Sequence, residues 1–554
     1  MLDKRIAALT AALALSLAPA AADAAQVWVA GSTEKIRPDA APRTDGEASI
    51  AAAKNEFEAF QVVVTGPAAR VSARATALTG PGTLLDVKLY REDLLDLRNA
   101  SAVDGGTGRW PDALVPDVDD VVGEQRNAFP FDVKGGESRA IWIEVRVPAD
   151  AKPGTYRGEV VVTASEGEWK VPVTLEVWDF QLPSTSSLRT SFGISYGGTL
   201  SGHGVSGDAN SELRARYGQL GLDHRISLTG ISDDGTDGLS NFEKWFAPLM
   251  NGTAPTRLAG AKLTAAKYIG DERSVEKKKK WAEYFRARGW MDRLFDYVCD
   301  EPPLTCAWSD IEPRTRSAHD ADPELQTLVT TQLWDAQEHG VDAGIDIIVP
   351  VINWNDDKPG SPVAGEQTAR YDGFRSGPRK EVWLYQSCMS HGCGGTVNIG
   401  SPSESDRYFT GWPSYMVDAS AVRNRAMEWL SFLMRADGEL YWETTMAYSH
   451  DAWSNQWDFS GNGDGTLFYP GTPSRIGGQT HIPVASIRLK MIREGMEDYE
   501  YLKLLADAGD REGAAQIARA LFPNAYSTDV DPARLMEARA ELAERILARK
   551  GGRK

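Results

Sequence analysis

Two acidic residues stand side by side at Asp300 and Glu301, after the apolar run RLFDYVC and directly before Pro302 and Pro303. Adjacent carboxylates repel each other, and two prolines remove two backbone donors, so fold stability does not call for this arrangement. An adjacent anion also disfavours ionisation of a carboxyl group, which keeps it protonated near neutral pH, as a general acid must be. The pair therefore indicates a catalytic site, unless one carboxylate caps a helix or pairs with an arginine.

The segments around this pair predict a (β/α)8 barrel. From about residue 188, strand-like runs alternate with helical stretches, and eight such strands follow one another over roughly 260 residues, the usual size of this fold. The third strand, within KLTAAKYIG, is the weakest of them. Barrel enzymes carry their chemistry at the carboxyl ends of strands, and Asp300 and Glu301 end the fourth. Because side chains alternate along a strand, both can reach the barrel mouth only if the strand ends or bulges there.

The residues before and after the predicted barrel show other patterns of apolar and polar residues. Before it, short alternating runs such as AIWIEVRVPADAKPGTYRGEVVVTA predict strands separated by turns. After it, the spacing of apolar residues predicts helices, the last within DPARLMEARAELAERILARK. We therefore expect a multidomain chain: an N-terminal antiparallel β-sandwich over residues 26–183, a (β/α)8 barrel over 188–480, and a C-terminal helical segment over 481–554 packed on the barrel.

Composition and charge narrow the classes of function. The chain is 42% hydrophobic and 25% charged, as in globular proteins, and its net charge of -18 argues against nucleic-acid binding. The basic run at residues 277–280 is interpreted as a solvated helix face. Residues 1–25 match a secretory signal peptide, with Lys4 and Arg5 before an Ala/Leu run and the small-x-small pattern Ala22-Asp23-Ala24. We expect a secreted or periplasmic protein without a membrane span.

Four cysteines in an oxidising compartment favour disulfides. The short separations pair Cys299 with Cys306 and Cys388 with Cys393, and metal binding is the weaker interpretation because no histidine lies at ligand spacing beside them. The run SGNGDGT resembles a calcium loop, but its twelfth position would be Gly471 instead of glutamate. We expect no metal and interpret this run as a loop after the eighth strand, near the site.

Several stretches resemble glycoside hydrolase family 123 and the related proteins that carry the domain of unknown function 4091. YVCDEP is similar to the Asp-Glu-Pro motif of that family, and supporting stretches are AAAKNEFEAFQVVV, WPDALVP, IWIEVRVPADAKPGTYRGEV, DHRIS, GDGTLFYPG and IREGMEDYEYLKLL. The resemblance implies a sandwich-plus-barrel glycosidase without cofactor. It also implies a glycan substrate ending in a 2-acetamido sugar, typically β-linked N-acetylgalactosamine, whose acetamido oxygen attacks the anomeric carbon. Glu301 then matches the general acid/base, and Asp300 the carboxylate that orients the acetamido nitrogen.

Other strand ends supply candidate substrate contacts, each of which could instead pack inside the barrel. They are Tyr196, Trp334, Asn353, Trp354, Tyr385, Trp442 and Glu443. Tyr385 is a candidate donor to the acetamido oxygen and Trp442 a stacking platform for a sugar ring. Since the seventh strand offers no acid, Glu443 on the eighth is the alternative nucleophile of a two-carboxylate retaining glycosidase with Glu301 as acid.

Two further classes remain as alternatives. GISYG at residues 193–197 matches G-x-S-x-G of serine hydrolases, but a loop is expected where a nucleophile elbow needs an immediate helix. A non-catalytic sugar-binding protein is the other, and the intact Asp-Glu pair argues against it. The charged stretch around Arg493-Glu494-Gly495 suggests no chemistry, and we expect it to dock the C-terminal helix on the barrel.

Overall fold

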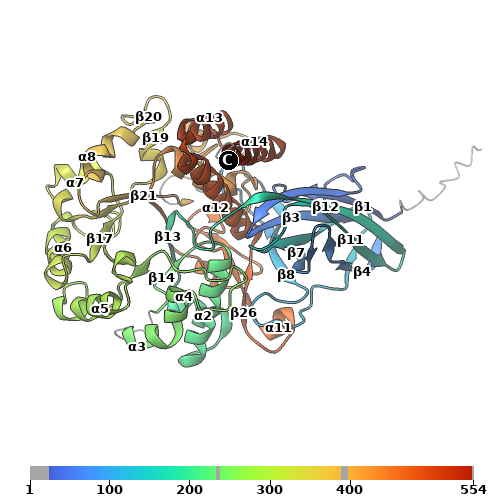
Figure 1. The fold of residues 1–554 in the computed structure, drawn as a ribbon, viewed down its shortest axis with the longest axis horizontal. Coiled ribbons are helices and arrows are strands. Elements are labelled where there is room, and N and C mark those ends of the chain that lie inside the picture. Colours follow the sequence, from blue (N-terminus) through green and yellow to red (C-terminus); the bar gives the residue numbers. More distant parts are fainter. Residues whose placement is uncertain (1–23, 233–237, 389–396, 552–554) are drawn as a thin grey trace, which may run out of the picture.

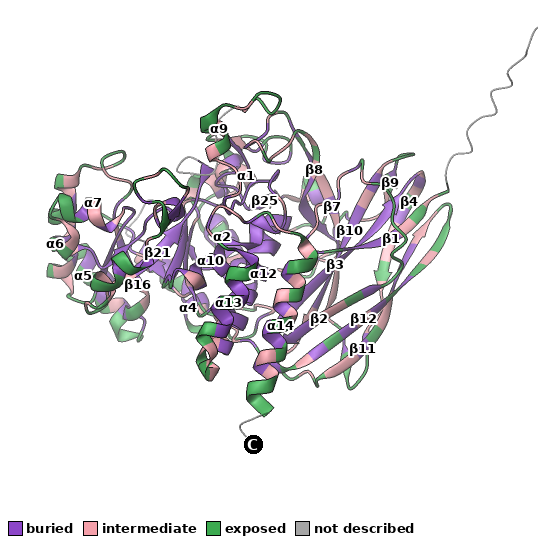
Figure 2. Ribbon diagram, turned by 90° about the horizontal axis from the view of Figure 1, so that it is seen from above, coloured by how far each residue is buried: buried purple, intermediate pink, exposed green. Residues whose placement is uncertain are grey.

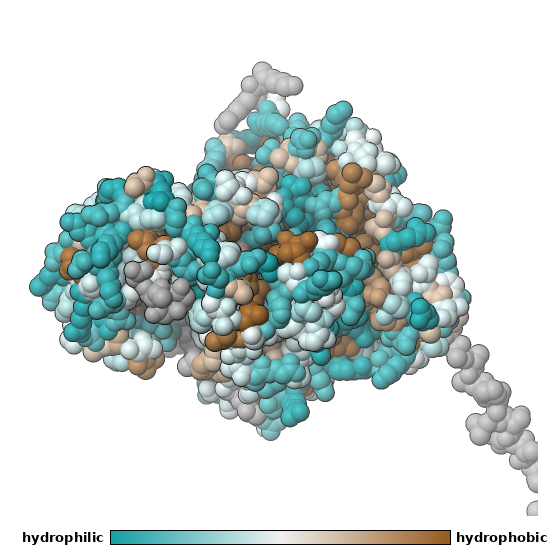
Figure 3. Space-filling view, turned by 90° about the horizontal axis from the view of Figure 1, so that it is seen from below, coloured by the Kyte–Doolittle hydropathy of each residue, from teal (hydrophilic) through white to brown (hydrophobic). Residues whose placement is uncertain are grey.

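The computed structural model describes residues 24–232, 238–388 and 397–551, so the predicted signal peptide lies outside the described residues except for its last two positions. A β-rich half, blue in Figure 1, lies beside a green-to-yellow half of alternating strands and helices, and the C-terminal helices pack between them. On the face in Figure 3 hydrophilic residues predominate, and hydrophobic ones form small separate areas. Within the described residues, no helix has the length and apolar character needed to cross a membrane.

The N-terminal half contains two sheets that share one hydrophobic core. Val62 of the first sheet and Val173 of the second lie in the same buried cluster. The first sheet, in spatial order, consists of β1 (Gln26–Gly31), β3 (Glu56–Thr65), β10 (Ser138–Val147), β7 (Val87–Leu97) and β8 (Gly108–Pro116). The second consists of β2 (Ala48–Lys54), β12 (Gly167–Gln181), β11 (Gly154–Ala164), β4 (Ala68–Ala75) and β9 (Phe131–Val133), with β5 (Leu78–Thr79) and β6 (Thr83–Leu84) beside it. β2 pairs with β12 in parallel, so the expectation of a purely antiparallel sandwich was wrong at that ladder.

The second half contains a nearly closed barrel of eight parallel strands in the described residues. In spatial order they are β14 (Leu228–Thr229), β13 (Arg189–Gly193), β22 (Gly438–Tyr441), β21 (Glu381–Tyr385), β18 (Ile347–Ile348), β17 (Gln326–Val329), β16 (Leu294–Cys299) and β15 (Ala266–Lys267). Runs such as QTLV in β17 are wholly buried, as expected for strands covered on both faces. No ladder among the described residues joins β14 to β15, so the barrel is open there, and the complete (β/α)8 pattern is only partly reproduced.

Helical segments lie between the barrel strands, but several are short. They are α1 (Tyr196–His203), α2 (Asp208–Asp223), α3 (Leu239–Asn241), α4 (Ala247–Asn251), α5 (Val275–Ala287), α6 (Trp308–Ala321), α7 (Leu333–Glu338), α8 (Asp372–Arg375), α9 (Glu404–Tyr408) and α10 (Met427–Leu433). The helix before β22 is the short α10, which is preceded by a 3₁₀ turn at Arg423–Arg425. The basic run in α5 is not wholly solvated either, because Lys278 is buried and its ammonium lies 2.6 Å from Asp296.

Smaller elements surround the barrel mouth and the sandwich. They are β19 (Asp356–Asp357), β20 (Gly365–Glu366), β23 (Trp457–Asp458), β24 (Gly461–Asn462), β25 (Phe468–Gly471), α11 (Pro473–Ile476) and β26 (Ile482–Ala485). The antiparallel hairpin of β25 and β26 spans the predicted boundary at residue 480. The domain limits therefore remain predictions.

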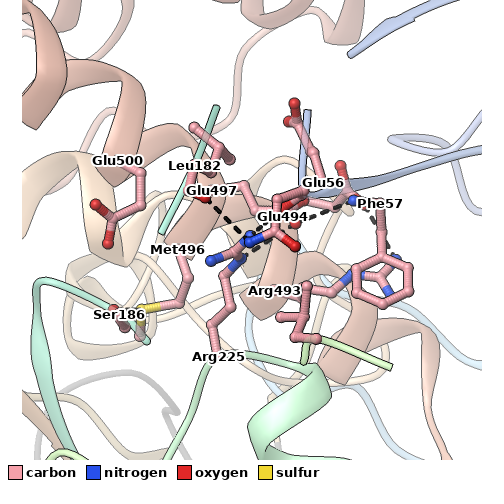
Figure 4. A network of polar contacts seen from close by, with 12 residues as sticks. Glu56, Phe57, Leu182, Ser186, Arg225, Arg493, Glu494, Met496, Glu497 and Glu500 are labelled. Atoms are coloured by element: carbon pink, nitrogen blue, oxygen red, sulfur yellow. Dashed lines mark hydrogen bonds and ion pairs between the residues drawn. The ribbon is translucent and has the colours of Figure 1, made fainter. Parts of the chain in front are cut away.

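The C-terminal helices are α12 (Ile487–Leu505), α13 (Arg511–Leu521) and α14 (Pro532–Gly551). α12 is buried along nearly its whole length between the two halves, as Figure 2 shows in purple. Its charged residues meet partners in both halves. Arg493 lies 2.8 Å from Glu144 of β10, and Glu497 Oε1 accepts hydrogen bonds from Arg225 Nε at 3.1 Å and from the Phe57 N–H at 3.2 Å (Figure 4). The Arg493-Glu494-Gly495 stretch thus docks on the sandwich as well as on the barrel, which corrects the expectation of a barrel contact alone.

Candidate active site

The turn that carries Asp300 and Glu301 begins where β16 ends. The pairing of β16 with β17 is irregular between Tyr297 and Cys299, and Glu301 has a φ of 41°, in the left-handed region. This is the local distortion that two adjacent carboxylates need in order to leave the strand toward the same mouth. A disulfide joins Cys299 to Cys306, with 5.9 Å between their Cα atoms, and closes the turn as predicted. The second predicted pair includes Cys393, which lies outside the described residues.

Hydroxyl groups from two neighbouring strands hold the Asp300 carboxylate. Tyr297 Oη donates to Asp300 Oδ1 at 2.7 Å, and Thr330 Oγ1 donates to the same oxygen at 2.8 Å. Thr330 Oγ1 also accepts a hydrogen bond from the Glu301 N–H at 2.7 Å. The bonds to the side chain converge on Oδ1, so Oδ2 of the exposed Asp300 is available to a ligand.

Glu301 is partly buried and receives a hydrogen bond from across the barrel. Tyr385 Oη at the end of β21 donates to Glu301 Oε1 at 2.5 Å. Burial raises the pKa of the Glu301 carboxyl, the Tyr385 hydrogen bond lowers it, and the Asp300 charge raises it, so that the pKa lies above its ordinary value. Burial is thus a larger cause than the neighbouring carboxylate from which the sequence argument began. A carboxyl group of raised pKa at a barrel mouth suits general acid catalysis.

A cavity of about 190 Å³ opens at the carboxyl ends of β13, β14, β15, β16 and β22. The polar and aromatic residues that line it are Ser191, Ser195, Thr229, Lys267, Tyr297, Tyr441, Trp442 and Glu443. Tyr297 belongs to this wall and also donates to Asp300, so the carboxylate pair borders the cavity. Predicted contacts Trp442 and Glu443 therefore share one cavity, next to Asp300 and Glu301.

Glu443 is buried, and one oxygen of its carboxylate is strongly engaged. Oε1 accepts hydrogen bonds from the Thr444 N–H at 2.8 Å, the Thr445 N–H at 2.9 Å and Thr445 Oγ1 at 2.9 Å. Burial raises the pKa of Glu443, and these donors oppose the rise. The group can accept hydrogen bonds from sugar hydroxyls or serve as a nucleophile, and its fixed orientation suits both.

The remaining predicted contacts lie around the mouth without lining this cavity. The ring of Trp334 packs near Trp354, 6.5 Å between centroids, and lies under the guanidinium of Arg370. Asn353 Nδ2 donates to Tyr408 Oη at 3.2 Å, while its buried Oδ1 has no partner in the described residues. Tyr196 Oη accepts from the Gly207 N–H at 3.3 Å. The free Asn353 oxygen is the strongest ligand feature among them.

Three residues of the site were not predicted: Tyr297, Thr330 and Lys267. Tyr297 follows the alternation of β16 and could have been found from its position three residues before Asp300. Thr330 directly follows β17, in the stretch TLVTTQLW, where a threonine gives no distinctive signal. Lys267 lies on the two-residue strand β15, and its ammonium is 5.3 Å from the centroid of the Tyr297 ring.

The serine of GISYG caps a helix. A helix does follow the strand immediately, since α1 begins at Tyr196, so the loop expected there was wrong. Ser195 is the N-cap residue, and its Oγ accepts a hydrogen bond from the Gly198 N–H at 3.0 Å. Among the described residues no histidine hydrogen-bonds to this hydroxyl, so the serine lacks the base that a hydrolase nucleophile needs.

The loop with SGNGDGT lies beside the cavity. Asp464 is buried, accepts hydrogen bonds from Tyr441 Oη at 3.2 Å and Trp442 Nε1 at 3.3 Å, and has its pKa raised by burial to about 6. It thereby fixes the indole of Trp442. In the described part of the chain, no group of three or more His, Cys, Asp or Glu side chains is arranged to hold a metal ion.

Comparisons with known proteins agree with this architecture. Residues 38–164 match the glycoside hydrolase 123 N-terminal domain, and residues 407–505 match the glycoside hydrolase 123 catalytic domain. The chain is thus similar to family 123 glycoside hydrolases in both of its halves, and the two matches support glycoside hydrolase activity. Its fold is similar to that of a family 123 glycoside hydrolase from Clostridium perfringens, at 14% identity, with 95% of this chain and 98% of that chain covered and a TM-score of 0.65. These matches favour an enzyme over a non-catalytic sugar-binding protein.

Other similarities are weaker. The β-glucuronidase of Parabacteroides merdae shares 9% identity, with 87% of this hydrolase and 52% of that chain covered and a TM-score of 0.26. No curated protein matches the hydrolase. The matched catalytic range begins after Asp300 and Glu301, so the roles of these two residues rest on their geometry and on the sequence motif.

Proposed function

We propose that this hydrolase removes terminal 2-acetamido sugars, of the β-N-acetylgalactosaminide type, from glycans by substrate-assisted catalysis with retention of configuration. The observation that supports this most strongly is the carboxylate pair at the barrel mouth. Glu301 of this pair is partly buried and has a raised pKa. The Asp300 carboxylate accepts hydrogen bonds through one of its two oxygens, Oδ1. The Clostridium perfringens structure, described in terms of glycolipid glycan hydrolysis, is consistent with a glycan substrate.

The geometry suggests different roles for Asp300 and Glu301 in the first step. Asp300 Oδ2 accepts a hydrogen bond from the acetamido N–H of the substrate, which increases the electron density on the acetamido oxygen. That oxygen forms a bond to the anomeric carbon while the bond to the leaving oxygen breaks, and Glu301 donates its proton to the leaving oxygen. Tyr385 Oη, which donates to Glu301 Oε1, is the proposed donor to the acetamido oxygen.

The second step returns the enzyme to its starting state. Glu301, now ionised, takes a proton from water, and the water oxygen attacks the anomeric carbon as the bond to the acetamido oxygen breaks. Two displacements at the same carbon retain its configuration. The Trp442 ring in the cavity wall offers a stacking surface for the sugar, and Glu443 accepts hydrogen bonds from its hydroxyls.

A second candidate mechanism uses Glu443 as a covalent nucleophile and Glu301 as the acid. The observation that favours it is that Glu443 lines the same cavity with one oxygen fixed by three donors. Glu443→Gln separates the two schemes: the substrate-assisted scheme predicts a modest loss of kcat, and the covalent scheme predicts a nearly complete loss.

The roles of Asp300 and Glu301 are tested by the dependence of kcat/KM on the leaving group. Glu301→Gln should lower kcat/KM by about 10²- to 10⁴-fold for a glycoside with a basic leaving group and much less for a nitrophenyl glycoside, since that leaving group needs little protonation. Asp300→Asn should give a defect that varies little with the leaving group. Glu338→Gln, at an exposed position of α7, is the matched control and should leave kcat/KM unchanged. Equal defects of Glu301→Gln on both substrates would remove Glu301 as the acid.

The proposal also includes the export of the protein from the cytoplasm. We propose that residues 1–25 direct export and are cleaved, which places the hydrolase where extracellular or periplasmic glycans are present. The disulfide between Cys299 and Cys306 supports an oxidising compartment. Mass spectrometry of the protein from its native host should show a mature N-terminus near residue 25, and an intact Met1 would contradict this.

A further inference from the structure

A second cavity, of about 310 Å³, lies at the boundary between the sandwich and the barrel. One wall comes from the end of β7 and the residues after it, and the other from the segment 454–457 together with Asn462 of β24. The volume is at the lower end of the range for ligand sites, roughly 300–1,000 Å³. This cavity is separate from the one at the carboxylate pair, because the two share no lining residue.

The β7 wall presents polar side chains that make no hydrogen bond to other described residues. Leu95 and Leu97 are buried in the core, whereas Asp96 and Arg98 alternate with them and are exposed. The side chains of Asp96, Arg98 and Asn99 line the cavity, and no hydrogen bond joins them to the described residues. A guanidinium, a carboxylate and an amide together offer several donors and acceptors to a ligand that carries hydroxyl groups.

The opposite wall carries an aromatic ring. Trp457 is partly exposed, lines the cavity, and its indole N–H donates to no group in the described residues. A flat indole face beside unengaged polar groups is the combination that sugar rings stack on and hydrogen-bond to.

The two walls are held together by hydrogen bonds. Trp457 faces Asn462 in the hairpin of β23 and β24. Asn462 Nδ2 donates to the Asn99 carbonyl at 2.8 Å, and the Asn462 N–H donates to Ser101 Oγ at 2.8 Å. Asp418 in turn accepts from Ser101 Oγ at 2.6 Å. The cavity is therefore a preformed site to which both halves of the chain contribute.

The same hairpin reaches the catalytic cavity. Its turn is Phe459-Ser460, both with positive φ, of 47° and 71°, which is unusual for residues other than glycine. The Phe459 ring is 41% exposed and meets the Trp442 ring edge to face, with 5.1 Å between centroids. One end of this short hairpin thus lines the second cavity, and the other contacts the wall of the catalytic cavity.

We propose that the second cavity is a carbohydrate subsite that holds one neutral pyranose unit of the glycan, beyond the bond that is cleaved. This proposal rests on the proposed function because it assumes that a glycan binds with its cleaved bond at the barrel mouth. A neutral unit fits because Asp96 and Arg98 are the two charged residues that line the cavity and their opposite charges cancel, so the wall favours neither an anionic nor a cationic sugar. Trp457 stacks on the ring, and Arg98 and Asn99 bind hydroxyl groups.

The test compares substrates with and without sugars beyond the scissile bond. Arg98→Ala should lower kcat/KM by about tenfold for a neutral tetrasaccharide that ends in β-N-acetylgalactosamine. It should leave kcat/KM for nitrophenyl β-N-acetylgalactosaminide unchanged, because that substrate does not reach the second cavity. Trp457→Ala should show the same selectivity, and Arg157→Ala, on an exposed position of β11, should change neither substrate. Equal losses on both substrates, or no loss on the tetrasaccharide, would overturn the proposal.

A binding measurement keeps this test separate from the proposed function. Neutral tri- and tetrasaccharides are titrated calorimetrically into the Glu301→Gln protein with and without Arg98→Ala. If the wild-type protein cleaves neither substrate, the proposed function fails, but binding that weakens about tenfold with Arg98→Ala still supports the subsite. Binding that is absent, or equal in both proteins, overturns the subsite even if the nitrophenyl glycoside is hydrolysed.

Discussion

Thr330 links the two carboxylates of the pair through one hydroxyl group. It donates to Asp300 Oδ1 and accepts from the Glu301 N–H, so the side chain of one residue and the backbone of the other are held by the same oxygen. Catalytic geometry of this kind tolerates little displacement, since a shift of about 1 Å can cost about 10²-fold in rate. Thr330 is therefore a positioning residue.

Thr330→Val tests this role. The change keeps the volume and removes the hydroxyl, so we expect kcat to fall by about 10- to 100-fold, KM to change little, and the free energy of unfolding to fall by about 1 kcal/mol. Thr331→Val is the matched control, because Thr331 is buried next to it and its hydroxyl makes no hydrogen bond in the described residues. An activity loss no larger than that of the control would contradict the role.

The pH dependence reports the pKa of Glu301. The acid must be protonated, so kcat/KM falls as the pH rises through this pKa. Tyr385→Phe removes a donor that lowers the pKa, so the alkaline limb should move to higher pH. Asp300→Asn removes a charge that raises the pKa, so the limb should move to lower pH. The profiles are measured with a glycoside that has a basic leaving group, because its cleavage requires the proton of Glu301. Shifts in the same direction for both variants would exclude this assignment.

The sequence indicated the candidate catalytic residues more readily than the residues that support them. Asp300 and Glu301 were proposed because adjacent acids before two prolines have no structural purpose, and Tyr385, Trp442 and Glu443 because strand ends converge at a barrel mouth. Thr330 has an ordinary residue type at an ordinary position, and only the packing of β16 against β17 reveals it. The burial that dominates the pKa of Glu301 likewise depends on the fold.

At the scale of elements, α12 carries the largest set of buried charges. Arg488 is fully buried, and its guanidinium donates to Asp112 Oδ1 at 2.9 Å and Asp112 Oδ2 at 2.7 Å. It also donates to the carbonyl groups of Tyr415 and Gly463. Removing one partner of a buried ion pair leaves an uncompensated charge, which is much more costly than the pair itself is favourable.

Arg488→Met should therefore lower the free energy of unfolding by about 3 to 5 kcal/mol in urea denaturation. Arg545→Met breaks the exposed pair of Arg545 with Glu541 on α14 and should cost at most about 0.5 kcal/mol. A small effect at Arg488, comparable with that of the control, would mean that Asp112 is neutral or hydrated in the folded protein.

The sequence was less informative about these helices. The charged stretch of α12 was expected to dock on the barrel, but its contacts with the sandwich were not predicted, because periodicity cannot show that an element is covered on both sides. Before α10, the buried polar side chains of Arg423, Asn424 and Arg425 make tertiary hydrogen bonds that no sequence pattern indicates. In contrast, the sequence predicted β16 and α14 well, because β16 is a compact apolar run and α14 has a single buried face.

At the scale of the whole molecule, the sandwich and the barrel share α12. Its cations pair with Asp112 of β8 and Glu144 of β10, so separating the halves would expose the buried residues of α12 and leave these charges unpaired. We expect calorimetry to show one unfolding transition, with equal calorimetric and van't Hoff enthalpies. A fragment of residues 184–554 should not accumulate as a folded protein. Two separate transitions would show instead that the predicted domains fold independently.

The most direct test of the central claim is the ratio of kcat/KM for two nitrophenyl β-galactosides, one with a 2-acetamido group and one with a 2-hydroxyl group. If the acetamido oxygen is the nucleophile, the first is cleaved with retention, as NMR of the first-formed anomer will show, and the second is nearly inert. Glu443→Gln should then retain substantial activity. Rapid cleavage of the 2-hydroxy glycoside, together with an inactive Glu443→Gln variant, would contradict the account and leave Glu301 as the acid of a two-carboxylate enzyme.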